Sequence, residues 1–471
     1  MSLSSAITTA QQIFNNTSIQ TTLVSKNIAN SGNADYSRRL ALLGSSANGA
    51  TVVSIQRAQS DALMKQTLAS ISQASAQDRL LSGLQAIKTS LGDNDYETSP
   101  ATYLSSFRDT LQTYAATPAS TTVAASVVAE ARDLALSISK TSAAVQDVRL
   151  QADKDIGNDV AELNRLLSEF EKVNNRIKGM TVSGADTSDA MDDREKLLKQ
   201  MSEIVGISTV GRANNDTVIY TSDGIVLFET TPRQVSFSPT VAFNAATTGG
   251  AVYVDGVELS SGTGGNTSAQ GRLQSLLQVR DDIAPTFQTQ LDELARGLVT
   301  LFQEGGAPGL FVWAGGTIPA PGTLVSGMAE TLSVNPLAES NPQLLRDGGF
   351  NGVVSNTGAN SGYSALLDSF VAALDAPMTF DGITELQTTG SITDFAGASL
   401  GWIEQLRSTA SAANDTKSAL LSRTQQALSN ETGVSIDEEL SLLLDLEQSY
   451  KASAKLVTTV DAMFRALMDA V

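Results

Sequence analysis

One pentapeptide of the chain carries the pattern of a serine nucleophile. Gly397-Ala398-Ser399-Leu400-Gly401 matches the G-x-S-x-G string, in which a sharp turn presents the serine hydroxyl for attack on a carbonyl. Such a serine needs a base to accept its proton, usually a histidine, and the chain contains no histidine. We therefore interpret the string as a coincidence in a sequence rich in Gly and Ser, and predict no catalytic residue.

An acidic stretch at residues 93–97 resembles the start of a calcium-binding loop. Asp93, Asp95 and Glu97 alternate as in an EF-hand, whose ligands come from alternate positions. Thr98 stands where that loop needs its turn glycine, and Pro100 follows. A solvated turn is the better interpretation, and we predict no metal site.

A second acidic group, Asp189, Asp192, Asp193 and Glu195, is dense enough for acid-base chemistry or for a cation. The same side chains at the start of a helix would complement its dipole and cap free backbone N–H groups. We favour this structural interpretation. The glycine-rich stretch 262–265 lacks the Gly-Lys-Ser/Thr ending of a phosphate loop, so it predicts a flexible linker and no cofactor site.

Composition narrows the function classes further. The 471 residues have a net charge of −19, which argues against nucleic-acid binding because a phosphate-binding face needs clustered Lys and Arg. There is no cysteine, which fits a protein that works outside the reducing cytosol without disulfides. The first charged side chain is Lys26, so we expect no ordinary cleaved secretory signal, and no apolar run is long enough to insert into a membrane.

The two ends of the chain have matching apolar stripes. The C-terminal stripe repeats every seven residues, with further apolar positions at spacings of three or four. It comprises Ile436, Leu440, Leu443, Leu446, Tyr450, Ala454, Val457, Val460, Phe464 and Leu467. The N-terminal stripe has the alternating spacing of a coiled-coil seam. It comprises Leu3, Ile7, Ala10, Phe14, Thr17, Thr21, Val24 and Ile28. We therefore predict that residues 1–35 and 433–471 pair in a helical coiled-coil stem.

The middle of the chain predicts long helices interrupted by a β-rich insertion. Apolar residues keep helical spacing over residues 127–177, and we expect an interruption at Gly157. Asp223-Gly224 and Asp255-Gly256 each lie between β-branched and aromatic residues, a hairpin signal. The predicted fold class is thus multidomain and mainly α. Its predicted parts are the terminal stem, a discontinuous helical domain (36–206 plus 266–432) with an irregular segment (305–362), and a small β-rich domain (207–265).

Two short motifs lie at the end of the N-terminal helix and just after it. Asn27-Ile28-Ala29-Asn30 is followed by Tyr36-Ser37-Arg38. This pair resembles the N-terminal motif of the bacterial flagellar axial proteins, the family of rod, hook and junction subunits, which reads N-I-A-N and then G-Y-[ST]-R. Asp35 stands where that family has glycine. Residues 433–440, 450–455 and 464–467 are similar to the family's C-terminal helix.

The middle of the chain points to one branch of this family. The strings MDDREKLL (191–198), QGRLQSLLQVRD (270–281) and LDELA (291–295) resemble the hook-associated members that form the junction between hook and filament. The resemblance implies a structural subunit and no enzyme. It also marks Asn27, Asn30, Tyr36 and Arg38 as motif residues.

The resemblance implies partners and a location as well. These are other copies of the chain in a ring or helical layer, the hook protein, a filament-side hook-associated protein, and an export chaperone on the C-terminal helix. We expect type III export without signal cleavage and assembly outside the cell. The residues expected to pack in the stem and between subunits are Leu3, Ile7, Phe14, Val24, Ile28, Ile436, Leu440, Leu443, Tyr450, Val457, Phe464 and Leu467.

Three alternatives stay open at this point. The chain could be another flagellar axial protein, because the terminal motifs are shared by rod, hook and junction subunits. A secreted enzyme would need a base and a nucleophile converging in one pocket. An adhesin or carbohydrate-binding module would place its function in the β-rich insertion.

Overall fold

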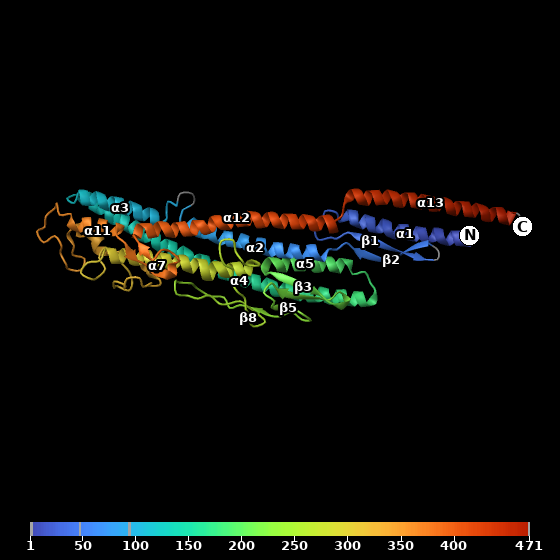
Figure 1. The fold of residues 1–471 in the computed structure, drawn as a ribbon, viewed down its shortest axis with the longest axis horizontal. Helices are drawn as coiled ribbons and strands as arrows, with labels where there is room; N and C mark the ends of the chain where they lie inside the picture. Colours follow the sequence, from blue (N-terminus) through green and yellow to red (C-terminus); the bar gives the residue numbers. More distant parts are fainter. Residues whose placement is uncertain (1–2, 47–48, 93–95, 470–471) are drawn as a thin grey trace. The chain divides into compact units, whose positions relative to one another are not determined.

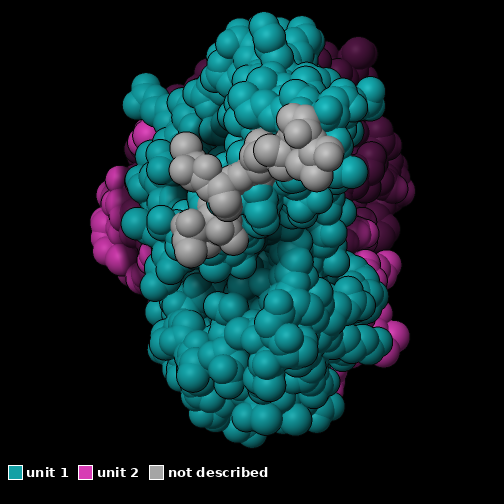
Figure 2. Space-filling model, turned by 90° about the vertical axis from the view of Figure 1, so that its right-hand side faces the viewer, with its two compact units in different colours: residues 1–74, 162–234, 417–471 teal, residues 75–161, 235–416 magenta. Residues whose placement is uncertain are grey.

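The computed structural model describes residues 3–46, 49–92 and 96–469, and it is mostly helical with small sheets (Figure 1). The predicted mainly α fold class is confirmed at this level. The chain forms two compact units, coloured in Figure 2. Unit 1 comprises residues 1–74, 162–234 and 417–471, and unit 2 comprises residues 75–161 and 235–416.

Three long helices contribute residues to both units. They are α2 (Asp61–Ser90), α4 (Thr121–Ser183) and α12 (Ile392–Thr432). The predicted interruption of α4 at Gly157 is wrong, because this 63-residue helix runs through the glycine. A helical glycine costs only about 1 kcal/mol relative to alanine, and Ile156 and Val160 beside it are buried. None of the described helices is long and apolar enough to cross a membrane.

Unit 1 contains both ends of the described chain. Helix α1 (Leu3–Ala29) packs against α13 (Ile436–Asp469) and against a hairpin of β1 (Arg39–Ser46) and β2 (Gly49–Arg57) (Figure 1). No glycine or proline interrupts α1, which ends where Asn30-Ser31-Gly32 follows. Helix α5 (Ser188–Ile204) and an antiparallel sheet also belong to unit 1. The sheet's strands are β3 (Ile207–Gly211), β4 (Thr217–Thr221) and β5 (Val226–Phe228).

The start of α13 is specified by the residues before it. A Cβ on Gly433 would lie 2.4 Å from the Ser429 carbonyl oxygen, so only glycine lets the chain leave α12 here. The Ser435 hydroxyl accepts a long hydrogen bond of 3.5 Å from the Glu438 backbone N–H, as an N-cap does. Acidic residues in the first turn complement the helix dipole.

Unit 2 has one large hydrophobic core. Its helices include α3 (Pro100–Ala116), α7 (Ala284–Leu301) and α11 (Ala365–Asp375). Aromatic residues make up only 5% of the chain, but several lie in this core, and four of these have their rings in contact. They are Phe107, Phe302, Phe311 and Phe370, with ring centroids of neighbouring pairs between 4.8 and 5.7 Å apart.

A π-helical turn, η2 (Val279–Ile283), lies between α6 (Arg272–Gln278) and α7, whose second residue is Pro285. The turn accommodates the proline, which lacks a backbone donor. A second three-stranded antiparallel sheet precedes α6. Its strands are β6 (Val235–Ser236), β7 (Tyr253–Val254) and β8 (Val257–Glu258), and the predicted turn at Asp255-Gly256 joins the last two.

The segment 305–362 lies against α7 and is held there by buried carboxylates. Asp292 accepts hydrogen bonds from the backbone N–H groups of Gly327 (3.0 Å) and Ala329 (2.8 Å). Glu304 accepts from Gly349 and Phe350, both at 3.0 Å. The segment's own elements are short: β9 (Phe311–Val312), α8 (Met328–Thr331), β10 (Ser333–Val334), α9 (Pro336–Ser340) and α10 (Leu344–Asp347). Strands β11 (Met378–Thr379) and β12 (Thr389–Gly390) follow α11.

Candidate functional site

Asn27 ties the end of α1 to the first residue of β1. Its buried amide oxygen accepts hydrogen bonds from the Tyr36 hydroxyl (2.8 Å) and the Arg39 backbone N–H (2.9 Å), and its Nδ2 donates to the Arg39 carbonyl (3.0 Å). Burial raises the pKa of Tyr36 to about 12, so the hydroxyl stays a donor at neutral pH. Asn30 acts more locally, because its Nδ2 donates to the Lys26 carbonyl one turn back (2.8 Å).

Arg38 joins the N-terminal motif to the C-terminal helices. Its backbone N–H donates to the Thr432 carbonyl at the end of α12 (2.8 Å). Its guanidinium donates to Glu439 Oε1 (2.6 Å) and to Glu438 Oε2 (2.8 Å), both in the first turn of α13. Glu439 is fully buried, so its charge depends on this arginine. The motif therefore holds the turn from which α13 starts.

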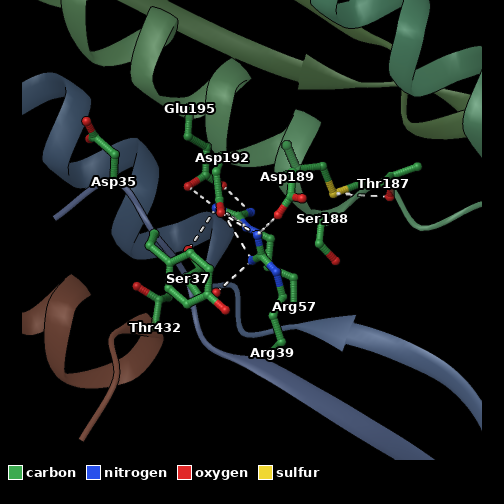
Figure 3. A network of polar contacts seen from close by, with 12 residues as sticks. Asp35, Ser37, Arg39, Arg57, Thr187, Ser188, Asp189, Asp192, Glu195 and Thr432 are labelled. Carbon is green, nitrogen blue, oxygen red and sulfur yellow. Dashed lines mark hydrogen bonds and ion pairs between the residues drawn. The ribbon is translucent and has the colours of Figure 1, made fainter. Parts of the chain in front are cut away.

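Two further arginines fasten the hairpin to α5 (Figure 3). Arg39 and Arg57 face each other across the β1–β2 ladder, and both guanidinium groups contact the Asp192 carboxylate. Arg57 also makes a bidentate pair with Glu195, and Arg39 donates to Asp189 (3.1 Å). Charge-assisted bidentate pairs of this kind fix geometry as well as charge.

Lysines complete the network around α5. Lys26 of α1 pairs with Asp189 (2.9 Å) and lowers the pKa of that carboxyl. Asp35, at the position where the resembled family has glycine, pairs with Lys199 of α5 (3.1 Å). The departure from the family pattern thus adds an ion pair between the motif and α5.

The acidic group on α5 forms ion pairs that the sequence did not predict. Asp189, Asp192 and Glu195 lie on α5, as the sequence indicated, and they neutralise Lys26, Arg39 and Arg57. Only Asp189 lies in the first turn, so it alone of the three complements the start of the helix. Sequence reasoning missed both arginines, since only the strand register brings residues 39 and 57 together. Among the described residues, no group of His, Cys, Asp or Glu could hold a metal ion. Residues 93–95 of the other acidic stretch lie outside the described part.

Helices α1 and α13 lie side by side within unit 1 (Figure 1). The buried face of α13 carries Glu439, Leu446, Ser453 and Val460, which are spaced seven apart. Leu446 and Val460 belong to the predicted stripe, but its seven-residue repeat flanks this face. Leu443 and Val457 are half-buried, whereas Ile436, Tyr450 and Phe464 are exposed, as is Leu440. On α1, Val24 is buried, and Ile7, Phe14 and Ile28 are half-buried. The side chains of Leu3 and Leu467 lie outside the described part.

A groove of about 560 Å³ runs between the two helices. Phe14, Thr17 and Thr21 of α1 line one wall, and Leu443 and Tyr450 of α13 line the other. The rings of Phe14 and Tyr450 meet edge to face, 5.0 Å apart. Since Tyr450 remains half exposed, the pair leaves apolar surface open along the groove.

Ser399 has a structural role. It lies within α12, away from any strand-to-helix turn, and its hydroxyl donates to Gln290 Oε1 of α7 (2.7 Å). The G-x-S-x-G string therefore has neither the backbone setting nor the base of a nucleophile elbow.

Two known protein families match parts of this chain. Residues 84–312 match the family described as the flagellar hook-associated protein FlgK helical domain. Residues 424–470 match the flagellar basal body rod FlgEFG protein C-terminal family, and this stretch includes all of the described α13.

Curated proteins that share one name are similar to this chain. "Flagellar hook-associated protein 1" of Salmonella typhimurium is 26% identical over 266 residues, which cover 54% of this chain and 47% of the relative. The Escherichia coli K12 protein of that name is 23% identical over 319 residues, covering 64% and 56%. The chain thus spans about half the length of the curated relatives it matches.

A solved structure shares the fold. The flagellar hook junction protein FlgK from Burkholderia pseudomallei aligns with a TM-score of 0.58 at 12% identity. The alignment covers 77% of this chain and 99% of the other. This likeness shows that the two chains share a fold. The two family matches are what relates the chain to flagellar proteins.

Proposed function

From the similarity of this chain to flagellar hook-associated protein 1, we propose that it is a non-enzymatic structural subunit that joins the flagellar hook to the filament. One observation carries the proposal. The two ends of the chain meet in α1 and α13, and α13 still exposes large apolar side chains after this pairing. Exposed apolar stripes of this size are typical of surfaces that bind other proteins.

The terminal helices form a coiled-coil stem that packs against the stems of neighbouring copies. Within it, Ile7, Phe14, Val24, Ile28, Leu443 and Val457 stabilise the pair, together with Leu3 and Leu467. Ile436, Leu440, Tyr450 and Phe464 contact neighbouring subunits, because they remain exposed in the single chain. Asn27, Asn30, Tyr36 and Arg38 hold the stem to the rest of unit 1 through the hydrogen bonds described above.

The route of export and the neighbouring subunits that we propose are those implied by the similarity to hook-associated proteins. The subunit leaves the cell through the type III apparatus, with a chaperone on its C-terminal helix, and assembles outside the cell in a ring or helical layer. Its neighbours are the hook protein and a filament-side hook-associated protein. The division into a stem (1–35 plus 433–471), a discontinuous helical domain and a β-rich insertion (207–265) belongs to the same proposal.

Deletion of the gene in the source bacterium tests this function. We expect hooks to form without attached filaments and flagellin to be shed into the medium, because the junction layer would be missing. Electron microscopy of cells and immunoblots of the medium measure both effects. Normal filaments on the deletion strain would exclude the proposed role.

A further inference from the structure

A break of three residues separates the end of α12 from the start of α13, within unit 1. Helix α12 ends at Thr432, residues 433–435 follow, and α13 begins at Ile436 (Figure 1). No proline occurs between residues 417 and 469, and Gly433 is the one glycine in that stretch. A single glycine rarely stops a helix by itself, so other features must explain the break.

The buried face continues in phase across this break. Thr432 is buried at the end of α12, and the buried face of α13 begins seven residues later at Glu439. Leu446, Ser453 and Val460 follow at the same spacing. Seven residues complete two helical turns to within about 20°. A continuous helix through the break would therefore bury the same side chains on the same face.

The broken form leaves polar groups without partners. In the described part of the chain, the backbone N–H groups of residues 434–437 form no hydrogen bond. In a continuous helix each would donate to the carbonyl four residues earlier. Glu439 is buried, and its Oε2 has no hydrogen-bond partner among the described residues. A buried oxygen of this kind costs free energy, so contacts elsewhere must hold the break.

Arg38 supplies such contacts. Its backbone N–H donates to the Thr432 carbonyl (2.8 Å), which is the acceptor that a continuous helix would offer to the N–H of Ile436. Its guanidinium pairs with Glu438 (2.8 Å) and Glu439 (2.6 Å) in the first turn of α13. Arg38 therefore binds the end of one helix and the start of the other at the same time.

Closing the break would move α13 along α1. An extended residue spans about 3.3 Å and a helical one about 1.5 Å, so three residues shorten by up to about 5 Å, close to one helical turn. The apolar stripes of α1 and α13 recur every three or four residues. A shift of one turn would thus bring each apolar layer of α1 opposite the next layer of α13, as in known one-turn register changes.

We propose that the junction of α12 and α13 is a two-state joint. One state is the broken form, which Arg38 holds, and the other is a continuous helix that carries α13 by up to one turn along α1. Both states bury the same face of α13, so residues 433–435 and Arg38 set the balance between them. The inference goes beyond the proposed function, because the movement takes place inside a single chain and needs no neighbouring copy.

Hydrogen exchange with mass spectrometry on the purified full-length chain tests the joint. Gly433→Ala with Ser435→Ala removes the glycine that lets the chain leave α12 and the hydroxyl that caps α13. Alanine favours the helix at both positions. The matched control, Gly401→Ala with Ser441→Ala, makes the same two changes at exposed positions inside α12 and α13.

We expect the amides of residues 434–437 to exchange about tenfold more slowly in the first variant, because they gain helical hydrogen bonds. Their exchange should not change in the control. Adding Val434→Pro to the first variant should abolish the gain, since proline has no N–H and keeps the residue before it out of a helix.

Three results would overturn the inference. The first is unchanged exchange at residues 434–437 in the first variant. The second is a gain that survives Val434→Pro, because it would not come from a helix. The third is loss of protection throughout α13, because the chain would then have no continuous alternative to the break. None of them affects the proposed function, which the gene deletion tests.

Discussion

At the scale of single residues, the N-terminal motif acts through buried polar contacts. Asn27 satisfies a hydroxyl, a backbone donor and a backbone acceptor that would otherwise be buried without partners. Arg38 does the same for the fully buried Glu439. Such groups stabilise little when they are paired and cost much when one partner is lost. Substitutions in the motif should therefore loosen the terminal helices well before they unfold the rest of the chain.

Replacement of Asn27 by alanine tests the first of these contacts. We expect the amides of residues 36–40 to lose protection by about 2–3 kcal/mol, because the Tyr36 hydroxyl and the Arg39 backbone lose their partners. Hydrogen exchange with mass spectrometry measures this directly. Asn30→Ala is the control, and its effect should stay near the end of α1. Equal effects of the two substitutions would contradict the role given to Asn27.

The titration of Asp292 makes the stability of unit 2 depend on pH. Burial raises the pKa of Asp292 to about 6, above the value of about 4 in an unfolded chain. The folded state therefore holds the proton more tightly, so this contribution to stability is fully present below pH 4 and is lost as pH rises toward 7. The loss should amount to about 3 kcal/mol.

Urea unfolding at several pH values measures this loss. Fluorescence reports on unit 2, since both tryptophans, Trp313 and Trp402, belong to it. In Asp292→Asn this contribution to the slope between pH 4 and 7 should disappear. An unchanged slope in the variant would show that another group titrates.

At the scale of helices and strands, the arginine contacts connect elements that are far apart in the chain. Arg38 links the motif loop to α12 and α13, while Arg39 and Arg57 link the hairpin to α5. The sequence was sufficient to predict the helical stripes, the Asp-Gly hairpins and the acidic helix start. It could not reveal which cation meets which acid, since that depends on strand register and on contacts between distant segments. It also predicted a break at Gly157, where the helix continues. The burial of Ile156 and Val160 outweighs the low helix propensity of glycine there.

A double substitution tests the link to α13. Arg38→Gln should lower the protection of residues 432–446 by about 3 kcal/mol, because Glu439 would be left as a buried charge without its partner. Adding Glu439→Gln removes that charge, so the double variant should recover much of the protection. Hydrogen exchange again provides the measurement. If the double variant were as loose as Arg38→Gln alone, the ion pair would not be the cause.

Two helical glycines of unit 2 should respond in opposite ways to alanine. At Gly157 of α4 a Cβ would meet Phe237 at an ordinary 3.8 Å, so the substitution should stabilise by about 0.5–1 kcal/mol. At Gly83 of α2 a Cβ would lie 2.8 Å from Val279 Cγ2, and overpacking should destabilise by about 1–3 kcal/mol. Urea unfolding followed by tryptophan fluorescence compares them. A loss of stability in Gly157→Ala would contradict the packing described for α4.

At the scale of the whole molecule, the two chain ends form the proposed assembly surface. The family matches over residues 84–312 and 424–470 support a junction subunit, and the exposed stripe of α13 supplies the surface through which it would bind. Terminal spacing alone predicted that the ends would meet. It included the buried Leu446 and Val460 in its stripe, but it did not predict that Glu439 and Ser453 would complete the buried heptad of α13, because a wide apolar stripe does not indicate which side faces its own chain.

Reconstitution on isolated hooks tests whether the exposed stripe of α13 is the assembly surface. Hooks from the deletion strain are incubated with the purified chain, the filament-side hook-associated protein and flagellin, and filament growth is scored by electron microscopy. The wild-type chain should support filaments. The variant Leu456→Ser with Phe464→Ser, both exposed on α13, should keep its helical circular dichroism and fail to bind hooks. Filament growth equal to that of the wild-type chain would contradict the claim that this stripe is the assembly surface.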